Sequence, residues 1–285
     1  MSSEETIAAA DVRRVSKRGA SQYHALVVVS ALILCSCQGG GPQVTRVQAR
    51  VVAPATTAAP GVYRLGMGAR RLRDLVNRDG TLVIPRQAAS RRPLPLIVLL
   101  HGGGGAAEDF RSKFPLADEY GVVMLALDSR DNTWDGIDSP FGPDVVAIDA
   151  ALRYAFERVA IDPKKIALGG LSDGGAYALS LGIANGDLFT HLVAVSPGFY
   201  APPAPPIGRP RIFLAHGRRD NVYSVAGTRG RIVPRLKDAG YDVTYFEFDG
   251  PHWVTEEAAR RALEWLVTSA HGSAESSARV PARSW

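Results

Sequence analysis

A chain of 285 residues, 46% hydrophobic and 21% charged, has the composition of a globular protein and a length that suits one large α/β domain. The formal net charge is +5, but the arginines are scattered and form no dense basic stripe, which argues against a nucleic-acid-binding protein. Both cysteines, Cys35 and Cys37, lie near the N-terminus, so the rest of the chain has none for a disulfide, a thiolate nucleophile or a thiolate metal site.

The N-terminal segment predicts export. Its apolar run at 25–34 is too short to favour a membrane-spanning helix, fits the hydrophobic region of a signal peptide, and follows four basic residues, Arg13, Arg14, Lys17 and Arg18. The next residues, Leu34-Cys-Ser-Cys37, resemble a bacterial lipobox, which implies a lipid on Cys37. We therefore predict a lipoprotein signal peptide over residues 1–37 and a protein anchored to a membrane of a bacterial cell envelope. Periplasmic release, plain secretion or a buried apolar segment are the alternatives.

Residues 38–61 are rich in Gly, Pro, Ala and Thr, which predicts a flexible tether. A single catalytic domain is expected over residues 62–270, and a disordered tail over 271–285. Within the domain, short apolar runs alternate with longer helical patterns, which predicts an α/β fold with a mostly parallel central sheet and helices on both faces. Strands are predicted at 81–85, 94–100, 122–127, 165–168, 192–195, 211–215 and 243–248, and helices at 144–159, 173–184, 224–239 and 255–269.

The segment Gly170-Leu-Ser172-Asp-Gly174 matches the Gly-X-Ser-X-Gly pattern of a nucleophile elbow. The pattern requires glycines because the turn between strand and helix is sharp and strained. The bare motif also arises by chance, so its position between a predicted strand and a predicted helix carries the argument. The alternative is a glycine-rich turn whose serine only caps the helix.

A serine hydroxyl needs a general base, which a carboxylate must hold in the right tautomer. Asp220 follows the predicted strand 211–215 and His252 follows the last one, which gives the chain order serine, acid, histidine. The sequence therefore predicts a catalytic triad of Ser172, Asp220 and His252. A turn carboxylate and a surface-loop histidine are the alternatives. Because the histidines form no HExxH motif or close His/Asp cluster, we expect no metal and no cofactor.

The glycine run His101-Gly-Gly-Gly-Gly105 follows the strand at 94–100. Backbone amides in such a run can face a developing oxyanion because glycine places no side chain in the way. We predict one donor at Gly103 and a second at the amide of Asp173, at the positive end of the following helix. The alternative is a phosphate-binding loop, but neither the GxxxxGK[ST] pattern nor the GxGxxG spacing with its distant acid is evident.

These motifs resemble those of α/β-hydrolase serine esterases of the carboxylesterase/phospholipase type, near the polyhydroxybutyrate depolymerases and feruloyl esterases. The resemblance covers residues 78–268 and includes the glycine run, Gly170-Leu-Ser-Asp-Gly-Gly175, Asn185-Gly-Asp-Leu-Phe-Thr-His191, Ser196-Pro-Gly198, His216-Gly-x-x-Asp220 and Gly250-Pro-His252. It implies cofactor-free hydrolysis of a small-molecule or lipid ester through an acyl-enzyme on Ser172.

The segment between the strands at 192–195 and 211–215 is short and proline-rich, so no large cap domain is expected there. An open site of this kind suits short to medium acyl esters. Trp134, in the loop 129–143, and Trp253 are the candidate substrate-binding residues, with cover for the core edge as the alternative for Trp134. A serine peptidase and a non-catalytic lipid-tethered binding protein on a hydrolase scaffold are the alternative functions.

Overall fold

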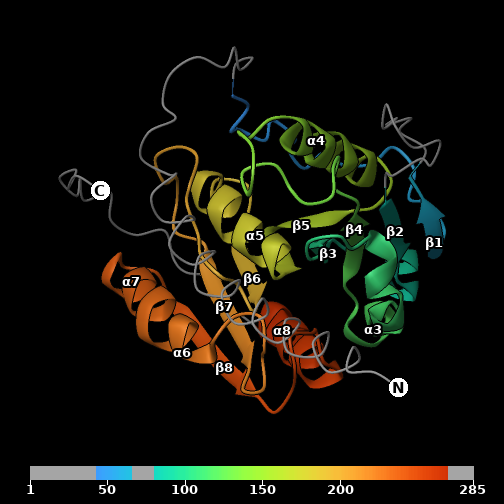
Figure 1. Cartoon of the computed structure of the whole chain (residues 1–285). Coiled ribbons are helices and arrows are strands. Elements are labelled where there is room, and N and C mark those ends of the chain that lie inside the picture. The colour runs from blue at the N-terminus through green and yellow to red at the C-terminus, as the bar shows by residue number, and fades with distance from the viewer. Residues whose placement is uncertain (1–42, 66–79, 269–285) are drawn as a thin grey trace, which may run out of the picture. The chain divides into compact units, whose positions relative to one another are not determined.

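The computed structural model describes residues 43–65 and 80–268, which build one eight-stranded sheet in the order β1-β2-β4-β3-β5-β6-β7-β8 (Figure 1). Strands β1 and β2 pair antiparallel, as do β2 and β4, and every later pairing is parallel. The strands are β1 Gly61–Arg64, β2 Gly80–Ile84, β3 Leu94–Leu100, β4 Val123–Leu127, β5 Ile161–Leu171, β6 His191–Val195, β7 Arg211–Gly217 and β8 Val243–Phe248. The predicted α/β class and its mostly parallel sheet are confirmed.

The central strands are apolar on both sides because helices cover both faces of the sheet. In β3, Leu96 and Leu100 pack into the larger core cluster, whereas Ile97 between them packs into the other cluster. All five residues of β4 are buried. Successive side chains of a strand therefore pack into two separate cores, one on each face of the sheet.

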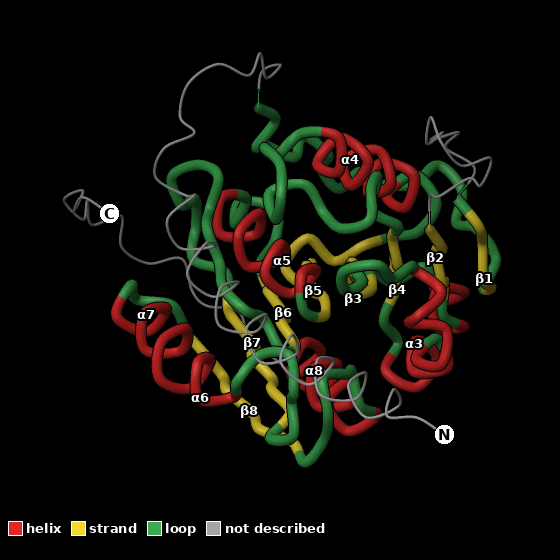
Figure 2. The backbone as a smooth tube through the Cα atoms, in the orientation of Figure 1, coloured by secondary structure: helices red, strands yellow, loops and turns green. Residues whose placement is uncertain are grey.

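The helices divide between these two cores. Helices α4 (Pro143–Phe156), α5 (Asp173–Ala184) and α7 (Val233–Asp238) supply the larger cluster, and α3 (Pro115–Tyr120) and α8 (Glu256–Thr268) supply the other. Figure 2 shows α3 and α8 near each other on one side of the sheet, with α4 and α5 on the opposite side. A 3₁₀ segment, η3 (Ala107–Lys113), leads from the glycine run into α3.

The single helix predicted over 224–239 is interrupted in the structure. It is divided into α6 (Val225–Gly227), a π-helical turn, η4 (Thr228–Ile232), and α7. Pro234 lies in the first turn of α7 and has no backbone N–H, so it cannot donate the i→i−4 bond of a continuous α-helix. The proline explains why the regular pattern restarts at Val233.

The flexible tether predicted over 38–61 is corrected for residues 43–61. Val47 and Ala49 are buried in the larger core cluster, and the Val47 amide donates a hydrogen bond of 2.9 Å to Asn185 Oδ1. The amides of Gln48 and Ala49 both donate to Asp149 Oδ1 at 2.6 Å. The alternation of Val47 and Ala49 with polar neighbours lets this segment cover the core.

Three predictions fall outside the described residues: the signal peptide over 1–37, the lipid on Cys37, and the tail over 271–285. Within 43–65 and 80–268, no helix has the length and apolar character needed to cross a membrane.

Candidate active site

Ser172 lies between the end of β5 and the start of α5 and has a strained backbone, with φ 55° and ψ −118°. Its amide donates a hydrogen bond of 2.9 Å to the Val195 carbonyl of the neighbouring strand. A Cβ at Gly170 would come within 2.5 Å of Gly174, and one at Gly174 within 2.2 Å of the Leu100 carbonyl oxygen. Only glycine fits at either place, which explains the spacing of the motif. A non-glycine residue held at this φ is typical of a functional turn.

Asp220 and His252 form the hydrogen bond that the sequence predicted. His252 Nδ1 lies 2.7 Å from Asp220 Oδ2, and the Asp220 side chain is 0% exposed. The amides of Val222 and Tyr223 donate to Asp220 Oδ1, both at 2.9 Å. With Nδ1–H directed at the carboxylate, Nε2 of a neutral His252 is left as a proton acceptor.

The carboxyl group of Asp220 stays ionised in this setting. Burial alone would raise its pKa, but hydrogen bonds from His252 and from two backbone amides, together with the nearby Ser196 hydroxyl, outweigh burial, so the pKa lies below its ordinary value. An ionised Asp220 is what the tautomer of His252 requires.

The glycine run lies beside the nucleophile. A Cβ placed on Gly102 would be 3.4 Å from Ser172 Cβ, and one placed on Gly103 would be 2.6 Å from Asp173 Oδ2. The structure therefore brings Gly103 and Asp173, the two predicted oxyanion donors, next to each other. Asp173 Oδ2 also accepts a hydrogen bond of 2.7 Å from Thr133 Oγ1. Gly103 and Asp173 both lie at the N-terminus of α5, where the helix dipole favours negative charge.

The model of the alpha/beta hydrolase family matches residues 97–285, more than half of the chain. The chain belongs to the alpha/beta hydrolase family. Its fold resembles that of esterase PE8 with a TM-score of 0.54 and 21% identity, over 67% of this chain and 98% of that one.

Two known proteins are related to this hydrolase in sequence. It is 32% identical over 169 residues to the esterase candidate NocK of Nocardia uniformis subsp. tsuyamanensis, which covers 56% of this chain and 47% of NocK. It is also 32% identical over 115 residues to an acetylxylan esterase of Coprinopsis cinerea, which covers 36% of this chain and 30% of that protein. The chain therefore spans less than half the length of either relative.

Trp134 does not line the surface of the site in this hydrolase, and the prediction of a substrate wall is corrected. Its side chain is 1% exposed and packs against Tyr177, with ring centroids 5.6 Å apart. The indole Nε1 donates a hydrogen bond of 2.8 Å to the His101 carbonyl, at the start of the glycine run. Trp134 thus supports the glycine run from inside the core, whereas Trp253 is 46% exposed and follows His252 directly.

A buried carboxylate pair holds the loop that carries Trp134 in this hydrolase. Asp135 and Asp144 each accept the backbone amide of the other at 2.7 Å, and the Tyr177 hydroxyl donates to Asp135 at 2.7 Å. Burial raises the pKa of Asp135, and it raises the pKa of Asp144 to about 6 with a further contribution from the Asp135 charge. The loop that carries Trp134 is therefore held by two carboxyl groups whose pKa values are raised in the folded chain.

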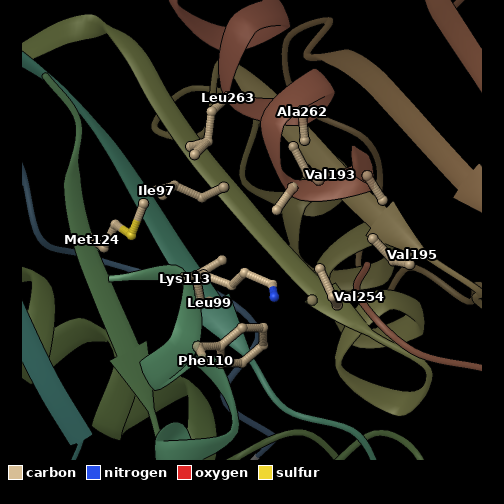
Figure 3. Close-up of a pocket in the computed structure, with 13 residues that line it drawn as sticks. Ile97, Leu99, Phe110, Lys113, Met124, Val193, Val195, Val254, Ala262 and Leu263 are labelled. Atoms are coloured by element: carbon tan, nitrogen blue, oxygen red, sulfur yellow. The ribbon is translucent and has the colours of Figure 1, made fainter. Parts of the chain in front are cut away.

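Two adjoining cavities lie on the α8 side of the hydrolase site. The smaller is bordered by Gly102 and by Leu171 and Trp253, the chain neighbours of Ser172 and His252. It shares Phe110, Lys113 and Val254 with a larger apolar cavity of about 40 Å³. Figure 3 shows the larger cavity between β3–β6 and α8, with these side chains facing it: Ile97, Leu99, Val193 and Val195 from the sheet, and Ala262 and Leu263 from α8.

Several site residues gave no signal as functional residues in the sequence. Tyr223 packs edge-on against His252 with ring centroids 5.7 Å apart, and its ring fills the space that Gly198 leaves open. Burial raises the pKa of Tyr223, and the charges of Asp173 and Asp220 add to the rise. Thr133 also gave no signal, whereas Ser196 and His216 stand in the motifs Ser196-Pro-Gly198 and His216-Gly-x-x-Asp220 but were given no role of their own. Each contacts a predicted site residue only through the folded structure.

The part of the hydrolase that the structure describes holds no group of three or more His, Cys, Asp or Glu side chains arranged to bind a metal ion.

Proposed function

We propose that the chain is a serine carboxylic ester hydrolase that acts through Ser172, His252 and Asp220. The observation that carries the proposal is the 2.7 Å hydrogen bond from His252 to a buried, ionised Asp220, with Ser172 on a strained elbow at the same edge of the sheet. This arrangement meets the needs of an activated serine: a base, an acid that orients it, and a turn that presents the hydroxyl.

In the proposed reaction, Ser172 Oγ attacks the carbonyl carbon of the ester while His252 Nε2 takes its proton. The backbone amides of Gly103 and Asp173 stabilise the negative charge on the carbonyl oxygen. His252 then gives the proton to the departing alcohol, which leaves an acyl group on Ser172. A water molecule, deprotonated by His252, releases the acid and restores the serine.

We propose short to medium acyl esters as the substrates. The names of the two sequence relatives, an esterase candidate and an acetylxylan esterase, support ester chemistry. In the described chain, residues 196–210 between β6 and β7 contain no helix that would cover the site. The larger cavity, which extends from beneath Gly170 of the elbow, has apolar walls apart from Lys113, and this favours an aliphatic group of limited length.

We also propose that the enzyme acts after export from a bacterial cytoplasm, with a lipid on Cys37 as its anchor. The proposal is supported by the basic residues and the apolar run at 25–34 that precede Leu34-Cys-Ser-Cys37. Labelling of cells with a radioactive fatty acid tests it. The Cys37→Ser variant is expected to lose the label.

The activity is tested with p-nitrophenyl esters from acetate to palmitate. We expect hydrolysis that is greatest for short or medium chains and that falls by about 10³-fold or more in Ser172→Ala. Ser180→Ala is the matched control, because Ser180 is also a buried serine of α5 but bonds only within the fold. Equal inertness of wild type and Ser172→Ala would reject the esterase. Labelling of Ser172 by a fluorophosphonate would then point to a peptidase, and no labelling to a binding protein.

A further inference from the structure

A second histidine contacts the carboxylate of the proposed triad. His216 lies near the end of β7 and is 0% exposed, and its Nε2 is 3.1 Å from Asp220 Oδ2. His252 Nδ1 contacts this same oxygen. Two imidazoles thus meet at one carboxylate oxygen, one from β7 and one from the loop after β8.

The neighbours of His216 define its hydrogen bonds. Nε2 also lies 2.9 Å from the Tyr223 carbonyl, so it faces two acceptors and must carry a proton. Nδ1 lies 2.8 Å from Thr228 Oγ1, whereas that hydroxyl is 3.4 Å from the Pro197 carbonyl. The shorter contact favours donation from the Thr228 hydroxyl to Nδ1. With Nε2 as the donor and Nδ1 as the acceptor, every printed contact of the His216 ring is satisfied.

We propose that His216 is a positioning residue that acts on His252 through Asp220, an inference that rests on the proposed function. Its Nε2–H restrains the rotation of the Asp220 carboxylate, which fixes the direction in which Oδ2 meets His252. The polar Nε2–H group, which bonds to the Tyr223 carbonyl, also lies 3.1 Å from Oδ2 and offsets part of its negative charge. Without His216, Oδ2 would stabilise the imidazolium form of His252 more strongly.

The other groups around the carboxylate do not replace this contact. The Val222 and Tyr223 amides bond to Oδ1, on the other oxygen. The Ser196 hydroxyl lies near the carboxylate, just after the end of β6. The other nearby titratable groups are Tyr223 and Asp173, whose charge raises the pKa of Tyr223. Removal of His216 therefore leaves the contacts to Oδ1 in place but removes the imidazole that lies against Oδ2.

The test compares pH profiles of kcat/KM for a short p-nitrophenyl ester. In His216→Ala we expect about a tenfold loss at pH 7 and an ascending limb displaced by about one pH unit to higher pH, so that much of the loss is recovered in alkali. His216→Gln keeps an N–H for Asp220 and an acceptor for Thr228, and should restore the limb. His191→Ala, in another buried histidine of the sheet, should leave the limb unchanged.

The outcomes separate this inference from the proposed function. A loss in His216→Ala that is the same at every pH, or a His216→Gln variant no better than His216→Ala, would overturn the positioning role. Thermal unfolding of each variant, followed by circular dichroism, shows whether the fold is retained at the assay temperature. If Ser172→Ala were as active as the wild type, the proposed function would fail and this inference with it.

Discussion

Trp134 Nε1 donates a hydrogen bond of 2.8 Å to the backbone carbonyl of His101, and the two rings lie 5.0 Å apart. The His101 ring in turn accepts the Ser129 amide at Nε2, at 3.0 Å. The loop after β4 therefore holds the first residue of the glycine run from two directions. The placement of the glycine run beside Ser172 and Asp173 therefore depends on buried side chains.

Replacement of Trp134 by Phe should show this dependence. The variant keeps an aromatic ring but leaves the buried His101 carbonyl without its donor, at a cost of about 1–3 kcal/mol in the free energy of unfolding. We expect kcat to fall about tenfold because the oxyanion donors shift. Urea unfolding and steady-state kinetics measure the two effects. Trp265→Phe, at a tryptophan of α8 that packs against Phe213 away from the glycine run, is the control, and equal effects on kcat in both variants would contradict the supporting role.

The Gly103→Ala variant tests the oxyanion pocket directly. The added Cβ would lie 2.6 Å from Asp173 Oδ2, so either the glycine run or the Asp173 side chain must move. We expect kcat to fall about 100-fold with a much smaller change in KM, because the lost stabilisation acts on the transition state.

Gly230→Ala is the matched control, because a Cβ there meets no atom within 4 Å. An active Gly103→Ala variant, with a fold confirmed by circular dichroism, would remove Gly103 from the oxyanion pocket.

The Asp144 carboxyl should make stability depend on pH. Its pKa is raised from 3.8 to about 6 in the folded chain, so the folded state holds the proton more tightly than the unfolded state. The contribution of Asp144 to the free energy of unfolding is complete below pH 3.8, the ordinary pKa. It is lost as the pH rises through about 6. The difference of about 2 pKa units corresponds to about 3 kcal/mol of unfolding free energy lost by pH 7.

Urea titrations between pH 4 and 7 measure this slope. Asp144→Asn removes the titrating group and should flatten the slope in this range, whatever its effect on absolute stability. Asp131→Asn, at an exposed carboxylate of the same loop, should leave the slope unchanged. A slope that persists in Asp144→Asn would assign the titration to another group, with Asp135 as the first choice.

The sequence predicted the local features of the site well. The elbow at Ser172 is a short motif with its own steric rule, and the pairing of Asp220 with His252 follows from the order of strands along the chain. The proximity of Gly103 and Asp173 was predictable for the same reason, since both follow strands that end at one edge of the parallel sheet.

The missed features depend on how side chains are directed in the folded chain. The motif His216-Gly-x-x-Asp220 places these two residues near each other in the sequence, but it does not show that the His216 ring contacts the Asp220 carboxylate. Trp134 was predicted at the surface because a loop tryptophan has no periodic pattern to show its burial. The composition of residues 43–61 suggested a tether, but Val47 and Ala49 are enough to pack the segment against the core.

The order of the strands also determines when the site can form during folding. Strand β3 pairs with β4 on one side and with β5 on the other, although β4 and α4 lie between β3 and β5 in the chain. Parallel pairings of this kind enclose long stretches of chain before they gain stability, which makes them slow. Ser172 and His252 lie on opposite sides of β6, β7 and β8 in the chain. A chain interrupted before β8 thus has Ser172 without His252, and the proposed activity arises only with completion of the sheet.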